Sequence, residues 1–185
     1  MPHIVKEIVY DGAQERIDRL GLGGLLEEVR TILTKFDLRV REEKDANGGA
    51  ALRKLLDSRF EQVPGWEGKK SGDIDWTKCR SIDGVRVCVG VEVQVSARSD
   101  MIAVDIIHLG AAIRRGGIDV GVLIVPSDYL SRFLTDRGPS IGAAERHMQA
   151  ARADDLPLLL IALEHDGPGK PLAKQEKRSR KARSV

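Results

Sequence analysis

Two carboxylates that lie far apart in the sequence, Asp75 and Glu92, are predicted to meet across a β-hairpin. Asp83-Gly84 is a dipeptide that a two-residue type I′ turn prefers, because both central positions need positive φ, and β-prone residues flank it on both sides. Counting outward from this turn along an antiparallel ladder places Asp75 directly opposite Glu92, with the two Cβ atoms about 5 Å apart. By the two-residue period of a strand, Gln94 follows on the same face.

This polar group predicts cation-dependent chemistry. Adjacent carboxylates repel each other, so they need either a shared proton or a cation between them, and we expect the cation. Oxygens of Asp75 and Glu92, with the backbone carbonyl between Glu92 and Gln94, suit a hard divalent ion such as Mg²⁺, for which Mn²⁺ can substitute. Such an ion activates a bound water and neutralises charge on a phosphorane-like transition state, which favours phosphodiester hydrolysis. The alternative is that both carboxylates are ordinary surface residues of the hairpin.

The composition favours a single soluble domain. A chain of 185 residues with 42% hydrophobic content is large enough to bury one core. No run approaches about 18 consecutive apolar residues, and the N-terminus lacks the apolar segment of a secretory signal, so we expect a cytoplasmic protein with no membrane partner. Cys79 and Cys88 face each other in the hairpin register, and in a reducing cytosol we expect free, packed thiols rather than a disulfide or a metal site.

The net charge of +2 is distributed unevenly. From Lys170 onward the chain carries seven basic residues against Glu176 alone, without apolar periodicity. We therefore expect one domain over residues 1–167 and a basic, disordered tail over 168–185. The tail either raises affinity for a polyanion through counterion release or is a solubilising segment or cloning remnant.

The hydrophobic patterns around the hairpin predict an α/β domain. Residues 3–10 and 36–40 resemble strands, and apolar residues recur at helical spacing over 25–33 and 50–60. After the hairpin, the sequence predicts a helix buried on most sides at 100–115, a central strand at 118–125, a short helix through residue 133, a helix at 141–153 and a last strand at 156–163. Strands and helices that alternate around a hairpin indicate a mixed sheet.

The order of these motifs carries a family resemblance. Asp73-Ile74-Asp75, the hairpin, and then Glu92-Val93-Gln94 resembles the PD-(D/E)XK nuclease core, with Gln94 where most members have Lys. The EVQ version, followed by a polar segment and a long apolar helix, resembles the BglII/BstYI family of type II restriction endonucleases. The resemblance extends through the blocks at 116–133 and 155–163, and less securely upstream, and so covers most of the chain up to about residue 165.

The resemblance implies a fold, a reaction and partners. The fold is a PD-(D/E)XK nuclease-like mixed central β-sheet flanked by helices. The protein would be a homodimer that encircles double-stranded DNA, reads a palindrome with a GATC core and cuts both strands with Mg²⁺, and a cognate DNA methyltransferase could act separately. By position, Asp75 becomes the main metal ligand, Glu92 a second ligand or the orienter of the attacking water, Val93 a carbonyl ligand, and Gln94 the polar substitute for Lys.

The hairpin of this chain is longer than the family pattern. In the family, the aspartate precedes the glutamate by nine positions, and here that step selects Asp83. A residue at the turn tip lies about 30 Å along the strand from Glu92, at about 3.3 Å per residue, so we assign Asp75 and treat the longer arms as an insertion. Asp73 is the reserve candidate.

The expected DNA contacts surround this hairpin. Arg can bond guanine in a bidentate manner, and Ser or Asp can bond other base edges. The candidates are Ser96, Arg98 and Ser99 after the second strand, the Lys69-Lys70 pair, and Asp136 and Arg137 in the loop 135–140. Alternatively, Ser99 or Asp100 caps the next helix. Asp105 and His108 lie one turn apart on that helix, and we interpret them as a satisfied polar pair.

Two other functions remain open from the residues alone. A DNA-binding protein could keep this fold without cutting, although the intact Asp75, Glu92 and Gln94 favour catalysis. A retaining glycosidase uses two carboxylates at a similar separation of about 5 Å. The aromatic content of 4% argues against a sugar-binding site.

Overall fold

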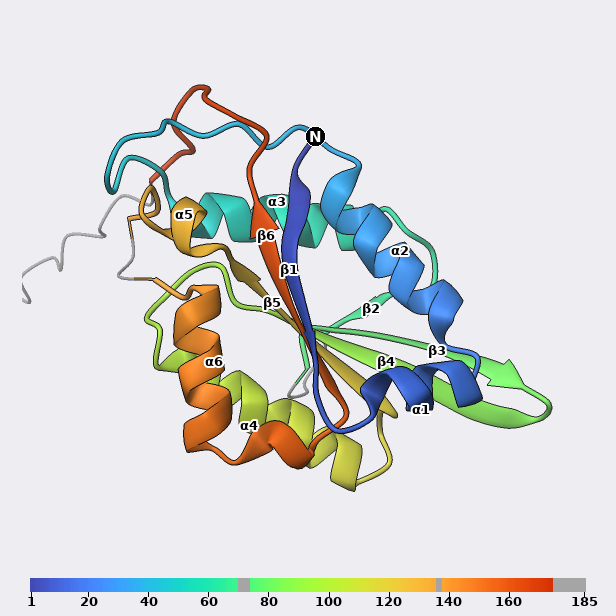
Figure 1. Cartoon of the computed structure of the whole chain (residues 1–185). Helices are drawn as coiled ribbons and strands as arrows, with labels where there is room; N and C mark the ends of the chain where they lie inside the picture. Colours follow the sequence, from blue (N-terminus) through green and yellow to red (C-terminus); the bar gives the residue numbers. More distant parts are fainter. Residues whose placement is uncertain (70–73, 136–137, 175–185) are drawn as a thin grey trace, which may run out of the picture.

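The computed structural model describes residues 1–69, 74–135 and 138–174 of the chain as one six-stranded sheet with helices on both faces (Figure 1). The elements are β1 (His3–Val9), α1 (Ala13–Arg19), α2 (Gly23–Thr34), α3 (Gly49–Glu61), β2 (Glu67–Gly68), β3 (Trp76–Ile82), β4 (Val85–Val93), α4 (Met101–Arg114), β5 (Val120–Pro126), α5 (Asp128–Ser131), α6 (Ile141–Ala150), the 3₁₀ turn η1 (Ala153–Asp155) and β6 (Leu158–Glu164). The predicted α/β fold, a mixed sheet flanked by helices, is confirmed.

The sheet order is β1-β6-β5-β4-β3-β2. Strands β4, β5 and β6 run parallel to one another, whereas β1, β3 and β2 each pair antiparallel with their neighbours. Because parallel strands end at the same edge of a sheet, the segments that follow β4, β5 and β6 all leave at one edge. The functional candidates after β4 and β5 therefore lie at this carboxyl edge.

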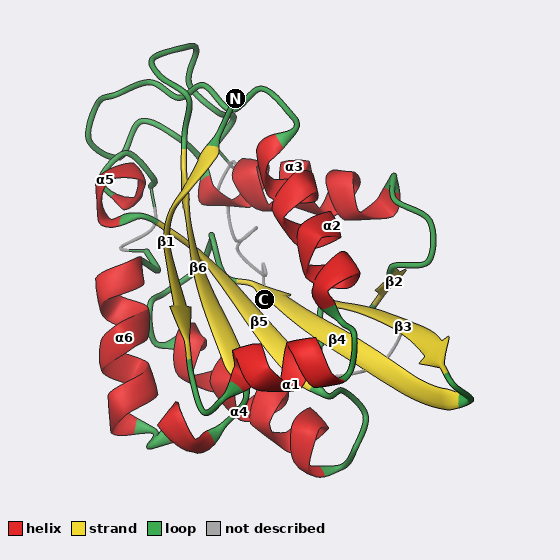
Figure 2. Cartoon of the chain, turned by 45° about the vertical axis from the view of Figure 1, so that its right-hand side comes forward, coloured by secondary structure: helices red, strands yellow, loops and turns green. Residues whose placement is uncertain are grey.

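The two faces of the sheet bury separate hydrophobic clusters. Helices α1, α2 and α3 cover one face and α4 and α6 cover the other (Figures 1 and 2). Along β4, Val89, Val91 and Val93 join the first cluster, whereas Cys88 joins the second, as the two-residue period of a strand requires. Glu92 follows the same alternation and points to the α4 side.

The hairpin has the predicted register. Pairs run without a shift from Ile82↔Val85 to Trp76↔Val91. Asp83 and Gly84 at the tip have φ values of 51° and 81°, the positive values that a type I′ turn needs. The expectation of free thiols is wrong, since Cys79 and Cys88 form a disulfide. The ladder sets them directly opposite each other, with their Cα atoms 4.0 Å apart, and this proximity outweighed the argument from compartment.

The chain that follows β6 stays bonded to the loop at 40–48 as far as Leu172. Pro168 forms a parallel bridge with Val40, the N–H of Gly169 donates to Val40 O at 2.7 Å, and the N–H of Leu172 donates to Asn47 Oδ1 at 3.1 Å. The described hydrogen bonds thus continue to Leu172, five residues past the boundary expected at residue 167. Residues 175–185, with most of the basic block, lie outside the described residues.

Two short strands differ from the sequence-based expectation. The strand expected at 36–40 is reduced to the single bridge at Val40, and the two-residue strand β2 was not anticipated. Among the described residues, no helix is long and apolar enough to cross a membrane.

Candidate active site

The predicted carboxylate pair is formed at the carboxyl edge of the sheet. Asp75 directly precedes β3 and Glu92 is the penultimate residue of β4, so the register, extended one step past the last ladder pair Trp76↔Val91, sets them opposite each other. The two carboxyl groups lie close enough for each to shift the pKa of the other. Asp75 is half-buried, whereas Glu92 is only 2% exposed. Asp83, the alternative that the family spacing selects, is exposed at the hairpin tip.

The guanidinium of Arg53, a residue of α3, lies against Asp75. Arg53 Nη2 lies 2.9 Å from Asp75 Oδ1, and Arg53 Nη1 donates to Val93 O at 2.7 Å. Asp75 Oδ2 accepts from the N–H of Val93 at 2.9 Å, so both of its oxygens have partners. The predicted carbonyl ligand, Val93 O, is thus bonded to a protein cation.

Arg53 is itself fixed by a neighbour on its own helix. Its Nε donates to both carboxylate oxygens of Asp57 at 2.9 Å, and Asp57 Oδ1 also accepts from Trp76 Nε1 at 3.1 Å. The sequence reasoning missed Arg53. The only available signal was its spacing of four residues from Asp57 on a predicted helix, which is common on helix surfaces.

Helix α4 brings two further ligand-type groups to Glu92. One donor atom each from Glu92, Asp105 and His108 lie within 4.8 Å of one another, and His108 Nδ1 is 3.6 Å from Glu92 Oε1. Glu92 Oε1 and Asp105 Oδ2 are buried and have no hydrogen-bond partner among the described residues. The interpretation of Asp105 and His108 as a satisfied polar pair is therefore wrong. Their spacing of one turn places both on the side of α4 that faces Glu92.

The clustering of carboxyl groups shifts their ionisation. Burial raises the pKa of Glu92 to about 10, and the hydrogen bond to Asp75 and the charges of Asp75 and Asp105 add to this. Burial also raises the pKa of Asp105 to about 7, again with help from Asp75. Burial alone would raise the pKa of Asp75 too. Interactions with Glu92 and Arg53 outweigh this effect, so the pKa of Asp75 is lowered. At neutral pH, Asp75 is ionised and Glu92 protonated.

Gln94 lies two residues after Glu92, and its side-chain amide bonds the backbone of the segment that follows. Its backbone N–H donates to Ile124 O at 2.8 Å, which fixes it beside β5, and its side-chain Nε2 donates to Ser96 O at 2.8 Å. The side chain is 8% exposed. Gln94 is therefore positioned at the same edge as the carboxylates and supports the turn that follows β4.

The described DNA-contact candidates lie around this edge. Lys69 is exposed, and its backbone N–H donates to Asp75 O at 3.0 Å, while its charge lowers the pKa of Glu92 and of Asp105. Ser96 and Ser99 are half-buried. Asp100 occupies the N-cap position of α4 without a side-chain capping bond.

Asp100 bonds the exposed Arg98 instead, at 2.8 and 3.1 Å. The alternative that Ser99 or Asp100 is the N-cap is therefore confirmed for the position of Asp100 but not for a side-chain bond, and the Asp100 carboxylate restrains a candidate DNA contact instead. Lys70, Asp73, Asp136 and Arg137 lie outside the described residues.

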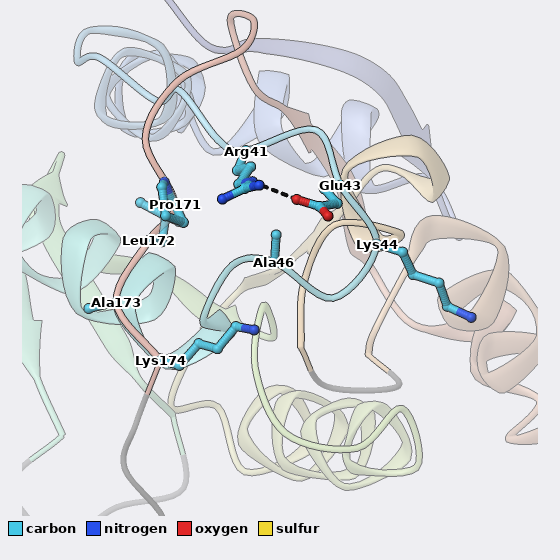
Figure 3. A pocket seen from close by; sticks show the side chains of 8 residues that line it. All are labelled: Arg41, Glu43, Lys44, Ala46, Pro171, Leu172, Ala173 and Lys174. Atoms are coloured by element: carbon cyan, nitrogen blue, oxygen red, sulfur yellow. Dashed lines mark ion pairs between the residues drawn. The ribbon is translucent and has the colours of Figure 1, made fainter.

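A separate pocket of about 490 Å³ lies between the loop after Val40 and the segment after β6 (Figure 3). Its lining residues are Arg41, Glu43, Lys44, Ala46, Pro171, Leu172, Ala173 and Lys174. Arg41 Nε pairs with Glu43 at 2.6 Å, and among the described residues the ammonium groups of Lys44 and Lys174 have no ion pair, which leaves the pocket basic. The loop is tied to the carboxyl edge, because the N–H of Asp45 donates to Arg132 O at 3.3 Å.

Comparison with known proteins agrees with this geometry. A family model described as restriction endonuclease BglII/BglIII matches residues 10–163, which contain the hairpin, Arg53 and helix α4. No curated protein matches the chain.

Proposed function

Because the chain belongs to the BglII family of restriction endonucleases, we propose that it is a Mg²⁺-dependent enzyme that cuts double-stranded DNA at a short palindrome, with GATC as the first candidate for its core. Membership of this family makes the protein a type II site-specific deoxyribonuclease, so the glycosidase reading is set aside. The observation that carries the metal-dependent mechanism is the contact between Asp75 and the buried Glu92, one residue pair beyond the end of the hairpin ladder.

The residues at this edge suit a divalent cation. One buried carboxylate oxygen of the pair, Glu92 Oε1, has no hydrogen-bond partner among the described residues, and an unpartnered buried carboxylate is costly unless a cation or proton compensates it. We assign Asp75, Glu92 and the carbonyl of Val93 as ligands of Mg²⁺, with Mn²⁺ as a substitute. When bound, the ion activates the attacking water and neutralises charge on the scissile phosphate.

The residues of the chain then divide the remaining work. Glu92, protonated at neutral pH in the metal-free site, becomes the carboxylate that orients the attacking water once a cation compensates its charge. Gln94 takes the place of the more usual lysine and offers a neutral amide near the reacting phosphate. Lys69, whose charge already reaches Glu92 and Asp105, supplies a positive charge at the same edge.

Arg53 sets a condition on this mechanism. Its Nη1 donates to Val93 O, so a cation bound at that carbonyl must either share the oxygen with the guanidinium or displace it. Its Nη2 neutralises Asp75 until then. We propose that Arg53 is a positioning residue, which holds the ligands in place before the cation and the DNA arrive.

DNA binding uses the loops at the carboxyl edge. Ser96, Arg98 and Ser99 follow β4 and are proposed to reach bases. To do so, Arg98 must break its ion pair with Asp100. Lys69, Lys70, Asp136 and Arg137 are proposed further contacts. The basic pocket beside this edge adds Lys44 and Lys174, which suit the phosphate backbone.

The remaining proposals follow from the palindrome. Cutting both strands symmetrically requires two equivalent sites, so we propose a homodimer on DNA. We also propose a cytoplasmic location, where the DNA to be cut is found, and a separate methyltransferase that protects the host sites. Light scattering with cognate DNA should give a dimer, and a monomer on DNA would argue against this arrangement.

The direct test is digestion of plasmid DNA with Mg²⁺, followed by sequencing of the new ends, with chelator in a parallel sample. We expect discrete fragments whose ends share one palindrome, and no cutting with chelator. Intact DNA with every divalent metal would refute the catalytic proposal. If the protein also retained sequence-specific binding, it would be the non-catalytic DNA-binding alternative.

A further inference from the structure

We propose that Glu92, Asp105 and His108 form a second divalent-cation site, on the α4 side of the sheet, that prefers a first-row transition ion such as Mn²⁺ to Mg²⁺. It shares Glu92 with the proposed catalytic site but uses neither Asp75 nor the carbonyl of Val93. The inference goes beyond the proposed function, because it concerns a site that the chain can load without DNA.

The geometry of the three groups supports a shared ion. Their donor atoms lie within 4.8 Å of one another, and ligands about 2.0–2.2 Å from one ion are separated by at most about 4.4 Å. A small rotation of one side chain therefore completes the set. Two anchors are rigid, since Glu92 is on β4 and Asp105 is buried on α4, whereas the partly exposed His108 can adjust and leaves a path from solvent.

Burial provides an independent reason for a ligand. Glu92 is 2% exposed and Asp105 is 8% exposed, and each has a buried oxygen without a partner among the described residues. Buried carboxyl oxygens in native proteins are normally hydrogen-bonded or bound to metal. Lys69 contributes positive charge nearby, but its exposed side chain forms no described ion pair with either carboxylate. On the α4 side, each carboxyl group thus keeps one buried oxygen without a hydrogen-bond partner in the described part of the chain.

The Asp75 side of Glu92 has the opposite character. Both oxygens of Asp75 are bonded, one to Arg53 and one to the N–H of Val93, and Arg53 also bonds Val93 O. A protein cation already compensates that side. The first ion to enter the DNA-free protein therefore finds its unsatisfied ligands on the side of Asp105 and His108.

The donor set determines the preferred ion. Mg²⁺ favours oxygen ligands only, whereas imidazole nitrogen suits first-row transition ions. One imidazole and two carboxylates leave further coordination positions, which water molecules can fill on Mn²⁺. The alternative, that His108 is a surface histidine beside an acidic pair, predicts no nitrogen ligation.

Mn²⁺ binding to the DNA-free protein tests this site, by calorimetry and by pulsed electron paramagnetic resonance, which detects a directly bound nitrogen. We expect tighter binding of Mn²⁺ than of Mg²⁺ and a nitrogen signal. His108→Ala should remove the signal and weaken Mn²⁺ binding at least about tenfold, equivalent to 1.4 kcal/mol, with little effect on Mg²⁺. Asp105→Asn should weaken Mn²⁺ binding similarly.

Controls separate this site from the proposed catalytic one. Asp75→Asn and His147→Ala, which changes a histidine of α6, should both keep the nitrogen signal. Absence of the signal in the wild type, its persistence in His108→Ala, or its loss in Asp75→Asn would each overturn the proposal. Thermal melting checks that every variant is folded. Because no DNA is present, failure of DNA cleavage would leave this result unaffected, and the reverse also holds.

Discussion

Arg53 Nη2 lies 2.9 Å from Asp75 Oδ1, so a protein cation occupies the side of the carboxylate pair where the sequence predicts a metal ion. The same guanidinium bonds Val93 O and Asp57, which links α3 to the end of the hairpin. The repulsion expected between the carboxylates is thus relieved in two ways, by Arg53 beside Asp75 and by a proton on Glu92.

Removing this guanidinium should destabilise the metal-free protein. Arg53→Ala leaves the half-buried Asp75 and Asp57 without their cation, and we expect a loss of about 1–3 kcal/mol in the free energy of unfolding. Urea denaturation in chelator measures it, with Lys54→Ala, an exposed change on the same helix, as the control. Saturating Mg²⁺ should reduce the loss, since it compensates Asp75. An equal loss with and without Mg²⁺ would show that Arg53 does not share a site with the metal.

The raised pKa of Glu92 predicts how stability depends on pH. Between about pH 4.5 and about pH 10 the folded protein keeps a proton that the unfolded chain loses, so this group's contribution to stability falls as the pH rises. Glu92→Gln removes that dependence and should stabilise the metal-free protein by about 1–3 kcal/mol near pH 8. The gain should disappear as the pH falls toward 4.5, where both states are protonated.

Denaturation across this pH range measures the difference between Glu92→Gln and the wild type. Glu61→Gln, at the exposed end of α3, is the control and should show no such trend. A Glu92→Gln variant that is less stable than the wild type near pH 8 would mean that Glu92 is ionised and stabilising in the metal-free protein.

Gln94 should matter for the rate of cleavage more than for DNA binding. Gln94→Ala removes the amide that stands in for lysine, and we expect single-turnover cleavage to fall on the order of 100-fold. DNA affinity in Ca²⁺ should change little. Gln149→Ala on α6 controls for a general effect of amide removal. An unchanged rate for Gln94→Ala would restrict this residue to the structural bond with Ser96 O.

The disulfide should stabilise the hairpin without being needed for its register. Seven backbone pairs and the Asp83-Gly84 turn set the register independently of the Cys79–Cys88 bond. Replacing both cysteines by serine should cost at most about 2–3 kcal/mol of stability, from the loop entropy of a short ring. Cleavage should remain within a few-fold of the wild type, with or without reductant. Complete loss of cleavage in a folded double variant would show that the disulfide positions Asp75 and Glu92.

The basic pocket should contribute to the salt dependence of DNA binding. If Lys44 and Lys174 each contact a phosphate, the double alanine variant should lower the slope of log affinity against log salt by about 2. Affinity should fall equally for cognate and unrelated DNA. Lys35→Ala, at the exposed end of α2, should leave the slope unchanged. A slope unchanged by the pocket variant would place the DNA elsewhere.

The predictable part of this site is the part that one strand-turn-strand unit determines. The turn at Asp83-Gly84 sets the register of the hairpin, so the position of Asp75 opposite Glu92 follows from local sequence alone. Arg53, Asp105 and His108 reach the site through packing of α3 and α4 on opposite faces of the sheet. Their helical patterns predict which faces are buried, but not the point along β4 at which each helix crosses.

The disulfide was missed for a different reason. The register predicted that Cys79 and Cys88 face each other, but spacing does not determine oxidation, and the argument from compartment favoured thiols. At the chain end, the charge pattern of the basic block could not reveal that Pro168 and Leu172 bond the loop at 40–48.

The rate of DNA cleavage by Asp75→Asn, measured beside Asp83→Asn and the wild type with Mg²⁺, tests the central claim most directly. Asp75 contacts Glu92, whereas Asp83 is exposed at the hairpin tip. We predict that the wild type cuts at one palindrome, that Asp75→Asn is slower by about 100-fold or more, and that Asp83→Asn cuts at nearly the wild-type rate. Cleavage that survives Asp75→Asn but is abolished by Asp83→Asn, or a wild type that cuts no DNA, would contradict the account.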